Sequence, residues 1–153
     1  MSLNKETKEL DKILRDINKC LVEYTKNSLK ENGLTMPRFL VLWHITKYEP
    51  VNMSVLHEKM YMANSTLTVI VDKLVEEELV KRYRNPEDRR EVLLELTKKG
   101  NDLLLEMLNI RQSFLEKSLK ELELDKQKEL INLLKPVMNN LEQNIKEADE
   151  NSG

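Results

Sequence analysis

The sequence predicts a mainly α-helical protein with one small β-hairpin. Leucine, lysine and glutamate are abundant, and the 153 residues include only 3 glycines and 4 prolines, a composition typical of helical proteins. Apolar residues recur three and four positions apart over most of the chain, as they do in amphipathic helices. Only one pair of short runs has β-strand character. A chain of this length can bury a hydrophobic core.

The first long helix is expected from about Asn4 to Lys30, with Asn32-Gly33 as its C-terminal stop. A helix of this length with a complete apolar stripe needs a partner surface. The stripe consists of Leu10, Ile13, Leu14, Ile17, Leu21 and Tyr24.

Thr35 is expected to cap a second helix, with Pro37 in its first turn. Its "RFLVLWHI" run is apolar nearly all round, which predicts a central, buried helix. A short helix is expected at about 54–60 and another at about 65–77. The stripe that faces the core in the latter is Leu67, Ile70, Val71 and Leu74.

Two β-rich runs, "LVKRYR" and "EVLLEL", flank a polar loop around Asn85-Pro86 and predict a two-stranded hairpin. In the second run Val92, Leu94 and Leu96 alternate onto one face. A short helix, a turn, a polar-faced helix and then a hairpin make a winged helix-turn-helix.

Two long helices are expected after the hairpin. Thr97 can cap one that runs to about Leu119, and Asp125 can cap one that runs to about Glu147, which Pro136 should kink. The expected organisation is a helix in 1–33, a winged helix-turn-helix domain in 34–100, and helices in 101–153, with the flanking helices in need of a partner surface.

Composition excludes several classes of function. The formal net charge is −2, so a nucleic-acid interface must rest on a local basic cluster. Cys20 is the only cysteine, which excludes an internal disulfide and fits a reducing cytoplasm. No apolar run approaches 18 residues, so neither a membrane span nor secretion is expected. Two histidines, one cysteine and no glycine-rich phosphate loop predict no catalytic site and no cofactor.

The outward side of the helix expected at 65–77 has side chains suited to reading DNA. Hydroxyl groups near its N-terminus can bond to base edges or phosphates, and threonine and valine methyl groups can pack on a thymine methyl. The alternative is that serine and threonine only cap the helix. The candidate DNA-binding residues on this helix are Ser65, Thr66, Thr68, Val69 and Lys73.

The segment "KRYRNPEDRR", residues 81–90, is the local basic cluster. Five basic residues against two acidic ones give a net charge of +3. An arginine at the tip can enter a narrow minor groove, and Pro86 limits the entropy lost on docking. Asp88 is expected to accept hydrogen bonds from Arg90 or from loop amides. The alternative is a solvated surface turn. The candidate DNA-binding residues here are Arg82, Arg84, Asp88, Arg89 and Arg90.

The stretches "STLTVIVDKLVEEELVKR" and "RNPEDRREVLLELTKKG" resemble the recognition helix and wing of the MarR (multiple antibiotic resistance regulator) family. The family's wing signature, Asp-x-Arg followed by Leu-Thr-x-x-Gly, corresponds here to residues 88–90 and 96–100. The resemblance covers nearly the whole chain. It implies a homodimer whose flanking helices, in 1–33 and 101–153, interlock as the dimer interface. It also implies a pseudo-palindromic operator, with recognition helices in successive major grooves and Arg90 of each wing in the flanking minor groove. It also implies a repressor that a small molecule or oxidation releases.

Three positions depart from the family pattern. Val69 stands where a basic residue is common, so bidentate reading of guanine is lost there. Glu78 stands where relatives often have glycine, which predicts a tighter turn or a longer helix. Leu56-His57 replaces a usual Leu-Ala, which predicts a changed packing angle between the two helices.

The residues that could serve a sensor also have plain structural roles. Peroxide-sensing relatives carry a cysteine in the first helix, but in another register, so we expect Cys20 to be a buried, inert thiol. His44, His57 and Glu58 could share a metal, yet zinc-sensing relatives are richer in histidine, and no metal site is expected. The candidate pocket residues for a small aromatic or anionic effector, which otherwise belong to the core, are Tyr24, Trp43 and His44.

The alternative function is a winged-helix module that binds a protein and has no specific DNA binding. Residues 35–100 contain 11 Lys and Arg against 10 Asp and Glu, and Glu76, Glu77 and Glu78 end the recognition helix. Double-stranded DNA is favoured because these acids lie away from the groove-facing end, whereas hydroxyls and arginines occupy the two expected contact points.

Overall fold

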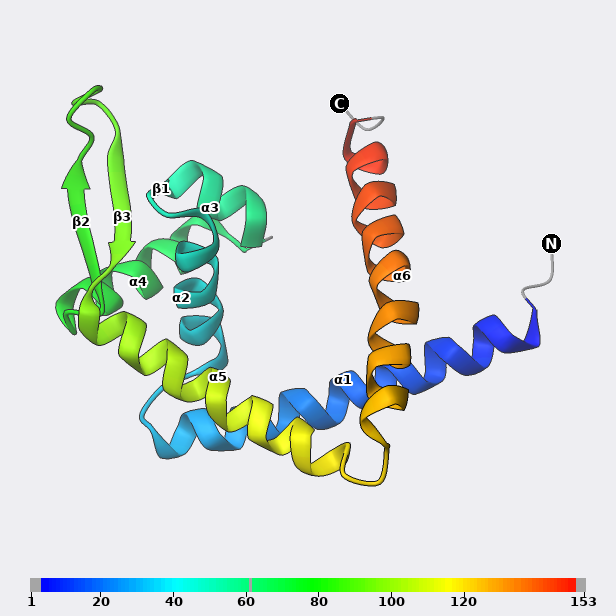
Figure 1. The fold of residues 1–153 in the computed structure, drawn as a ribbon. Helices are drawn as coiled ribbons and strands as arrows, with labels where there is room; N and C mark the ends of the chain where they lie inside the picture. The colour runs from blue at the N-terminus through cyan, green and yellow to red at the C-terminus, as the bar shows by residue number, and fades with distance from the viewer. Residues whose placement is uncertain (1–3, 61, 151–153) are drawn as a thin grey trace. The chain divides into compact units, whose positions relative to one another are not determined.

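The computed structural model describes residues 4–60 and 62–150, and it is mainly helical with a small sheet, as the sequence predicts (Figure 1). The fold divides into two compact units, residues 1–112 and 113–153. The elements are, in chain order, α1 (Lys5–Glu31), α2 (Met36–Tyr48), β1 (Val51–Asn52), α3 (Met53–Met60), α4 (Asn64–Glu76), β2 (Val80–Arg84), β3 (Val92–Leu96), α5 (Lys98–Ser118) and α6 (Leu124–Glu150).

The helix boundaries lie within one or two residues of the predicted ones, because the signals that start and stop helices are local; the exception is the end of α6, which lies at Glu150 and not at about Glu147. The Asn4 side chain caps α1 by accepting from the amide of Thr7 at 2.7 Å. Thr35 occupies the N-cap position of α2, but its side chain makes no capping hydrogen bond. The prediction that Asp125 caps the last helix is wrong: α6 begins at Leu124, and Asp125 lies in its first turn, where a carboxylate favours the helix dipole.

The sheet has three strands, one more than the predicted hairpin. Its order is β1-β3-β2 and all pairs are antiparallel, with Val51 and Arg82 on either side of Leu94. Leu94 is fully buried, as expected, but Leu93 on the opposite face is also only 9% exposed. Leu93 lies between Asn52 of β1 and Tyr83 of β2, so this central-strand position is shielded although the rest of its face is not buried.

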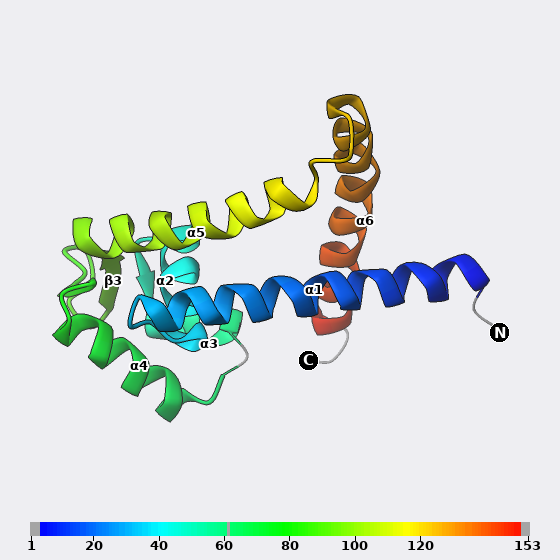
Figure 2. The same cartoon turned by 90° about the horizontal axis from the view of Figure 1, so that it is seen from below.

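The hydrophobic core of the first unit joins α2, α3, α4, the sheet and α5. Leu67, Val71 and Leu74 present one buried stripe of α4 to this core, which fixes the opposite side of α4 toward solvent. Figure 2 shows α4 running from the connection after α3 to the start of β2. The helix that the sequence predicts to read DNA is therefore held from behind by apolar packing.

The C-terminus of α4 ends in a tight, hydrogen-bonded turn. The amide of Glu78 donates to the carbonyl of Val75 at 3.0 Å, and the amide of Leu79 donates to the carbonyl of Leu74 at 2.9 Å. This pair of bonds is the Schellman motif, which needs a left-handed residue between its donors. Glu78 takes that conformation with φ 59°. The helix is therefore not extended by the departure from glycine; instead a glutamate adopts a backbone conformation that favours glycine.

The start of α5 is joined to this turn. The Thr97 hydroxyl donates to the carbonyl of Glu78 at 2.6 Å and accepts from the amide of Gly100 at 3.0 Å, so it caps α5 as predicted. The amide of Thr97 donates to the carbonyl of Leu79 at 3.1 Å. A Cβ at Gly100 would lie 2.0 Å from that same carbonyl oxygen. The spacing of Thr97 and Gly100 thus fits one cap and one close backbone approach.

Two segments leave apolar side chains uncovered. In the first unit, every residue from Asn4 to Cys20 on α1 is exposed. The prediction of a buried Cys20 is therefore wrong, because no other described part of the first unit covers this half of α1. In the second unit α6 continues through Pro136, and its exposed apolar residues are Leu124, Leu130, Ile131, Leu133, Leu134, Val137, Met138, Leu141 and Ile145. Among the described residues, no helix combines the length and apolarity needed to cross a membrane.

Candidate nucleic-acid interface

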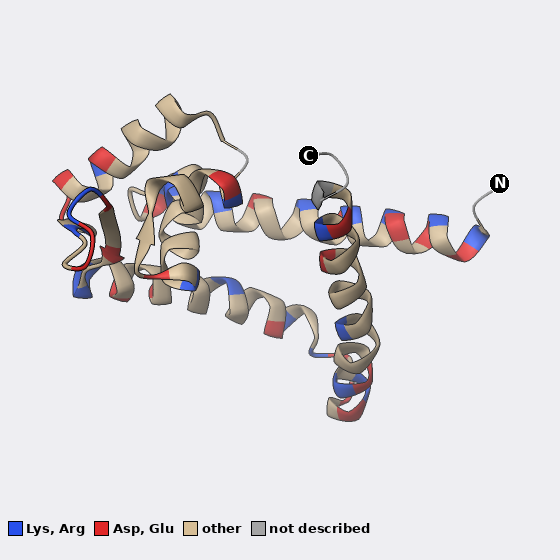
Figure 3. Cartoon of the chain, turned by 90° about the horizontal axis from the view of Figure 1, so that it is seen from above, with Lys and Arg blue, Asp and Glu red and all other residues tan. Residues whose placement is uncertain are grey.

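The outward face of α4 carries hydroxyl and aliphatic side chains and few charged ones. Ser65, Thr66 and Thr68 are exposed, and Val69 is 68% exposed although it is a large apolar residue. The Thr68 hydroxyl donates to the carbonyl of Asn64 at 2.9 Å. Figure 3 shows that the first turns of α4 carry no Lys, Arg, Asp or Glu. This surface can therefore offer hydroxyl and methyl groups to a groove.

The charged residues that follow on this face are paired. Lys73 Nζ lies 2.9 Å from Glu76 Oε2 on the same helix. Arg82 Nη2 of β2 lies 2.7 Å from Asp72 Oδ1 of α4. The bridge between Arg82 and Asp72 joins the wing to the recognition helix. The sequence had no signal for this pairing, because it spans a helix end, a turn and a strand.

The wing loop, residues 85–91, is built from side-chain bonds to its own backbone. The Asn85 side chain accepts from the amide of Glu87 at 3.0 Å, and the Asp88 carboxylate accepts from the amide of Arg90 at 3.0 Å. The second bond is one of the two that the sequence predicted for Asp88. Arg84 also donates to the carbonyl of Arg89 at 3.0 Å. These bonds restrict the loop without using its two distal arginine side chains.

Glu91 anchors the base of the wing. Its carboxylate accepts hydrogen bonds from the side-chain amides of Asn52 and Asn85, the latter at 2.6 Å. These bonds, with that from Asn52 the stronger, hold the pKa of Glu91 below its usual range. Asn52 also accepts from the amide of Val55 at 2.9 Å and so connects the wing to the start of α3. Sequence reasoning missed these anchoring roles, since only strand pairing brings Asn52 beside the loop.

Arg89 and Arg90 remain available at the end of the wing. Both are exposed, and within the described part of the chain neither guanidinium has a hydrogen-bond or ion-pair partner. Arg82 and Arg84, which the sequence grouped with them, instead hold the wing in place. The five predicted wing residues thus separate into three that position the loop, among them Asp88, and two that are free to bind.

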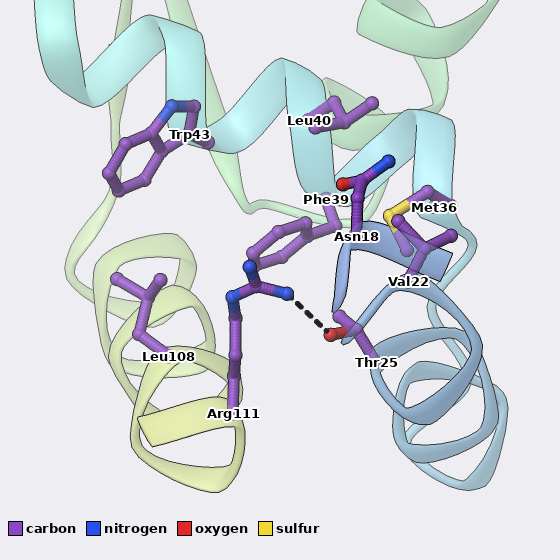
Figure 4. A pocket seen from close by; sticks show the side chains of 9 residues that line it. All are labelled: Asn18, Val22, Thr25, Met36, Phe39, Leu40, Trp43, Leu108 and Arg111. Atoms are coloured by element: carbon purple, nitrogen blue, oxygen red, sulfur yellow. Dashed lines mark hydrogen bonds between the residues drawn. The ribbon is translucent and has the colours of Figure 1, made fainter. Parts of the chain in front are cut away.

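A pocket of about 290 Å³ lies between α1, α2 and α5 (Figure 4). Trp43 lines it, as predicted for a crevice residue, whereas Tyr24 and His44 lie outside the lining. Arg111 reaches from α5 toward α1 and donates to the Thr25 hydroxyl at 3.2 Å. The full lining is Asn18, Val22, Thr25, Met36, Phe39, Leu40, Trp43, Leu108 and Arg111.

The histidines lie in separate surroundings. His44 stacks on Tyr48 with ring centroids 6.1 Å apart; burial, and then the charge of Lys47, lower the pKa of His44. His57 lines an open groove with Asn64 and Arg82 between α3, α4 and the wing. Over the described ranges, no three residues of the His, Cys, Asp and Glu types are grouped as metal ligands would be.

These features define a winged helix-turn-helix protein: α3 and α4 form the helical pair, and β2 and β3 form the wing. The family model described as the MarR family matches residues 34–92. YsmB of Bacillus subtilis, described as an uncharacterized HTH-type transcriptional regulator, is 31% identical to this chain over 107 residues, which cover 70% of this chain and 73% of YsmB.

Two further comparisons agree with this result. The HTH-type transcriptional regulator MgrA of Staphylococcus aureus is 30% identical over 75% of this chain and 77% of its own. The structure of a MarR family protein from Bacillus stearothermophilus superposes with a TM-score of 0.83 at 27% identity, covering 92% of this chain and 99% of that one. The chain belongs to the MarR family, whose members are DNA-binding transcriptional regulators and not enzymes.

Proposed function

We propose that this regulator is a cytoplasmic repressor that binds a pseudo-palindromic operator as a homodimer and leaves it when a small aromatic or anionic effector binds. The observation that carries the proposal is the braced wing. Its loop is fixed by its own hydrogen bonds, while Arg89 and Arg90 keep free guanidinium groups. A structure that orders a loop and leaves its outermost cations unpaired is suited to a polyanion.

The two surfaces fit two parts of the duplex. The exposed N-terminal half of α4 presents Ser65, Thr66 and Val69 to base edges in a major groove. The wing arginines then contact phosphates and the flanking minor groove, where the negative potential of narrow A·T-rich segments attracts a guanidinium group. Because the Arg82–Asp72 bridge joins wing and helix, both contacts belong to one rigid surface.

The dimer is supported by the exposed apolar stripes. On α1, Leu10, Ile13, Leu14 and Ile17 are 38–49% exposed, and the stripe on α6 is longer. Helices with this pattern gain stability by burying the stripe against another apolar surface. We assign residues 1–33 and 101–153 to a dimer interface with a second copy of this chain, and residues 34–100 to DNA binding.

The pocket beside α2 supports the effector proposal. Trp43 and Phe39 offer aromatic surface and Arg111 offers a cation, a combination that suits a small aromatic carboxylate. The volume fits a ligand of about one substituted ring. The lining comes from α1, α2 and α5, so an occupant would act on the helices that connect the proposed dimer interface to the winged domain.

The first experiment is a fluorescence-anisotropy titration against the DNA beside the protein's own gene, with a scrambled duplex as control, at two salt concentrations. We expect selective, salt-sensitive binding of two chains per duplex, with the stoichiometry checked by sedimentation. Equal weak binding to both duplexes, followed by failure to select any sequence from random DNA, would contradict the proposed function and favour the protein-binding module.

The effector proposal is tested on the same complex with benzoate and its neutral analogue benzamide. Benzoate should release the DNA and benzamide should not, because only benzoate pairs with Arg111. The Arg111→Gln variant should keep DNA binding and lose the response to benzoate. Equal release by both compounds, or an unchanged response in the variant, would exclude Arg111 as the anion partner.

A further inference from the structure

Val69 lies on the outward face of α4, where burial within the chain does not account for an apolar side chain. Its side chain is 68% exposed, whereas Leu67 and Val71 on the same helix are fully buried. Valine is a weak helix former because its branched Cβ restricts rotation against the preceding turn. An exposed helical position therefore favours other residues unless the two methyl groups have a partner outside the chain.

Several groups near this valine that could read bases by hydrogen bonding are already engaged within the chain. The Thr68 hydroxyl is engaged with the carbonyl of Asn64, and Lys73, the only cation of α4, is paired with Glu76. On the wing strands, Arg82 is paired with Asp72 of α4. The usual strong contact to guanine, a bidentate arginine or lysine, is thus missing from the part of the surface that Val69 dominates.

We infer that Val69 recognises the C5 methyl group of a thymine in each half-site, and that this methyl contact sets the sequence preference of α4. The inference rests on the proposed operator binding and specifies its chemistry. In the major groove thymine is the base that presents a methyl group, so an apolar side chain prefers it by removing both methyl surfaces from water. The rigid valine brings this surface to the groove with little loss of side-chain freedom on binding.

The test begins with selection of duplexes from a random 24-base-pair library by the full-length protein. In the selected duplex each thymine is then replaced singly by deoxyuridine, which removes only the C5 methyl group. We expect one position per half-site where the replacement weakens binding by about fourfold, and about 15-fold when both half-sites carry deoxyuridine. Elsewhere the replacement should have little effect. Cytosine at the sensitive position should bind weakly, and 5-methylcytosine should recover part of the loss.

Two variants assign the effect to the residue. Val69→Ala should bind the thymine and deoxyuridine duplexes almost equally, while Val69→Ile, which keeps the branched methyl groups, should retain the difference. Neither should melt below the wild type, because the side chain is exposed and alanine favours a helix more than valine does. The combination forms a cycle between protein and DNA in which only a direct contact gives a coupling term.

The possible outcomes distinguish failure of the proposed operator binding from failure of the methyl contact of Val69. Failure to enrich any sequence from the library would contradict the proposed function itself. An enriched duplex that binds equally well with every thymine replaced would overturn the methyl contact and leave the regulator intact. A sensitive thymine whose effect persists in Val69→Ala would assign the contact to another residue and overturn the role of Val69.

Discussion

The first turns of α4 and the end of the wing are both surfaces proposed to meet DNA, but their chemistry is opposite. The α4 surface has no charged residue before Asp72, and its most exposed apolar side chain is Val69. The end of the wing carries Arg89 and Arg90, and neither pairs with any described residue. Cations bind every sequence alike through phosphates, whereas methyl and hydroxyl groups depend on the bases. The difference indicates that the wing provides affinity for DNA of any sequence, whereas α4 provides selectivity among sequences.

The same two surfaces share one mechanical joint. The turn at Glu78 and Leu79 ends α4 and begins β2, and Thr97 at the end of β3 bonds to the carbonyls of both residues. The position of the wing relative to the recognition helix therefore depends on a few backbone contacts. Substitutions at the joint should affect both surfaces together, and substitutions at either surface should affect one.

The largest effect is expected for Gly100→Ala, which disturbs the joint at Glu78 and Leu79. The new Cβ would lie 2.0 Å from the carbonyl oxygen of Leu79, so the backbone must move, at a cost of about 3 kcal/mol in the free energy of unfolding. Urea denaturation measures this loss. Gly33→Ala is the matched control, because φ is 69° there but a Cβ meets nothing within 4 Å, and it should cost about 1 kcal/mol. Equal costs would show that contact with Leu79 is unimportant.

The next largest effect is expected for Arg90→Ala, which removes one of the two exposed cations at the end of the wing. Loss of this cation should weaken binding to all duplexes by about 2 kcal/mol and reduce the salt dependence by about one ion per wing. The Arg90 guanidinium has no partner among the described residues, so the melting temperature should not change. Lys47→Ala, an equal charge change at an exposed position of α2 outside the α4 surface and the wing, is the control. Normal DNA binding by Arg90→Ala would remove the wing from the interface.

A smaller effect, of opposite sign, is expected for Glu78→Gly. A residue with a Cβ is disfavoured at φ 59°, so glycine should increase the free energy of unfolding by about 1 kcal/mol. Glu78→Ala removes the carboxylate but keeps the Cβ, and it should behave like the wild type. Calorimetric melting compares the three proteins. A gain in stability with alanine as large as that with glycine would assign the effect to charge and not to the backbone.

Asp72→Asn should reduce the chemical difference between the α4 surface and the end of the wing. The pair with Arg82 is exposed, so its loss should change the free energy of unfolding by only about 0.5 kcal/mol. It frees a cation beside the α4 surface, however, and binding to the scrambled duplex should become tighter and more dependent on salt. Adding Arg82→Ala should reverse this change. An unaltered selectivity ratio in Asp72→Asn would mean that the bridge has no part in discrimination.

The features predicted from the sequence were those that depend on neighbours along the chain. Helix boundaries, the Thr97 cap and the Asp88 bond all follow from residues within a few positions of one another. By contrast, β1 is a two-residue strand with no periodicity to detect, and the exposure of Cys20 depends on what covers α1. The lining of the pocket by Arg111 follows from how α5 packs against α1. Such contacts require the fold, which the sequence pattern predicts only in outline.

The base of the wing allows the finest test, because a single carboxylate links the loop to β1. Hydrogen bonds from Asn52 and Asn85 lower the pKa of Glu91, so its contribution to stability is complete above the ordinary glutamate pKa of about 4.3. That contribution is lost as the pH falls through the lower pKa of the folded state.

Wild-type stability should therefore decline more steeply on acidification than that of Glu91→Gln, as measured by urea denaturation between pH 6 and pH 3. Glu87→Gln changes a carboxylate in the same loop that accepts no described hydrogen bond, and it should follow the wild type. Parallel pH profiles for all three proteins would show that the wing is held by its strand pairing alone.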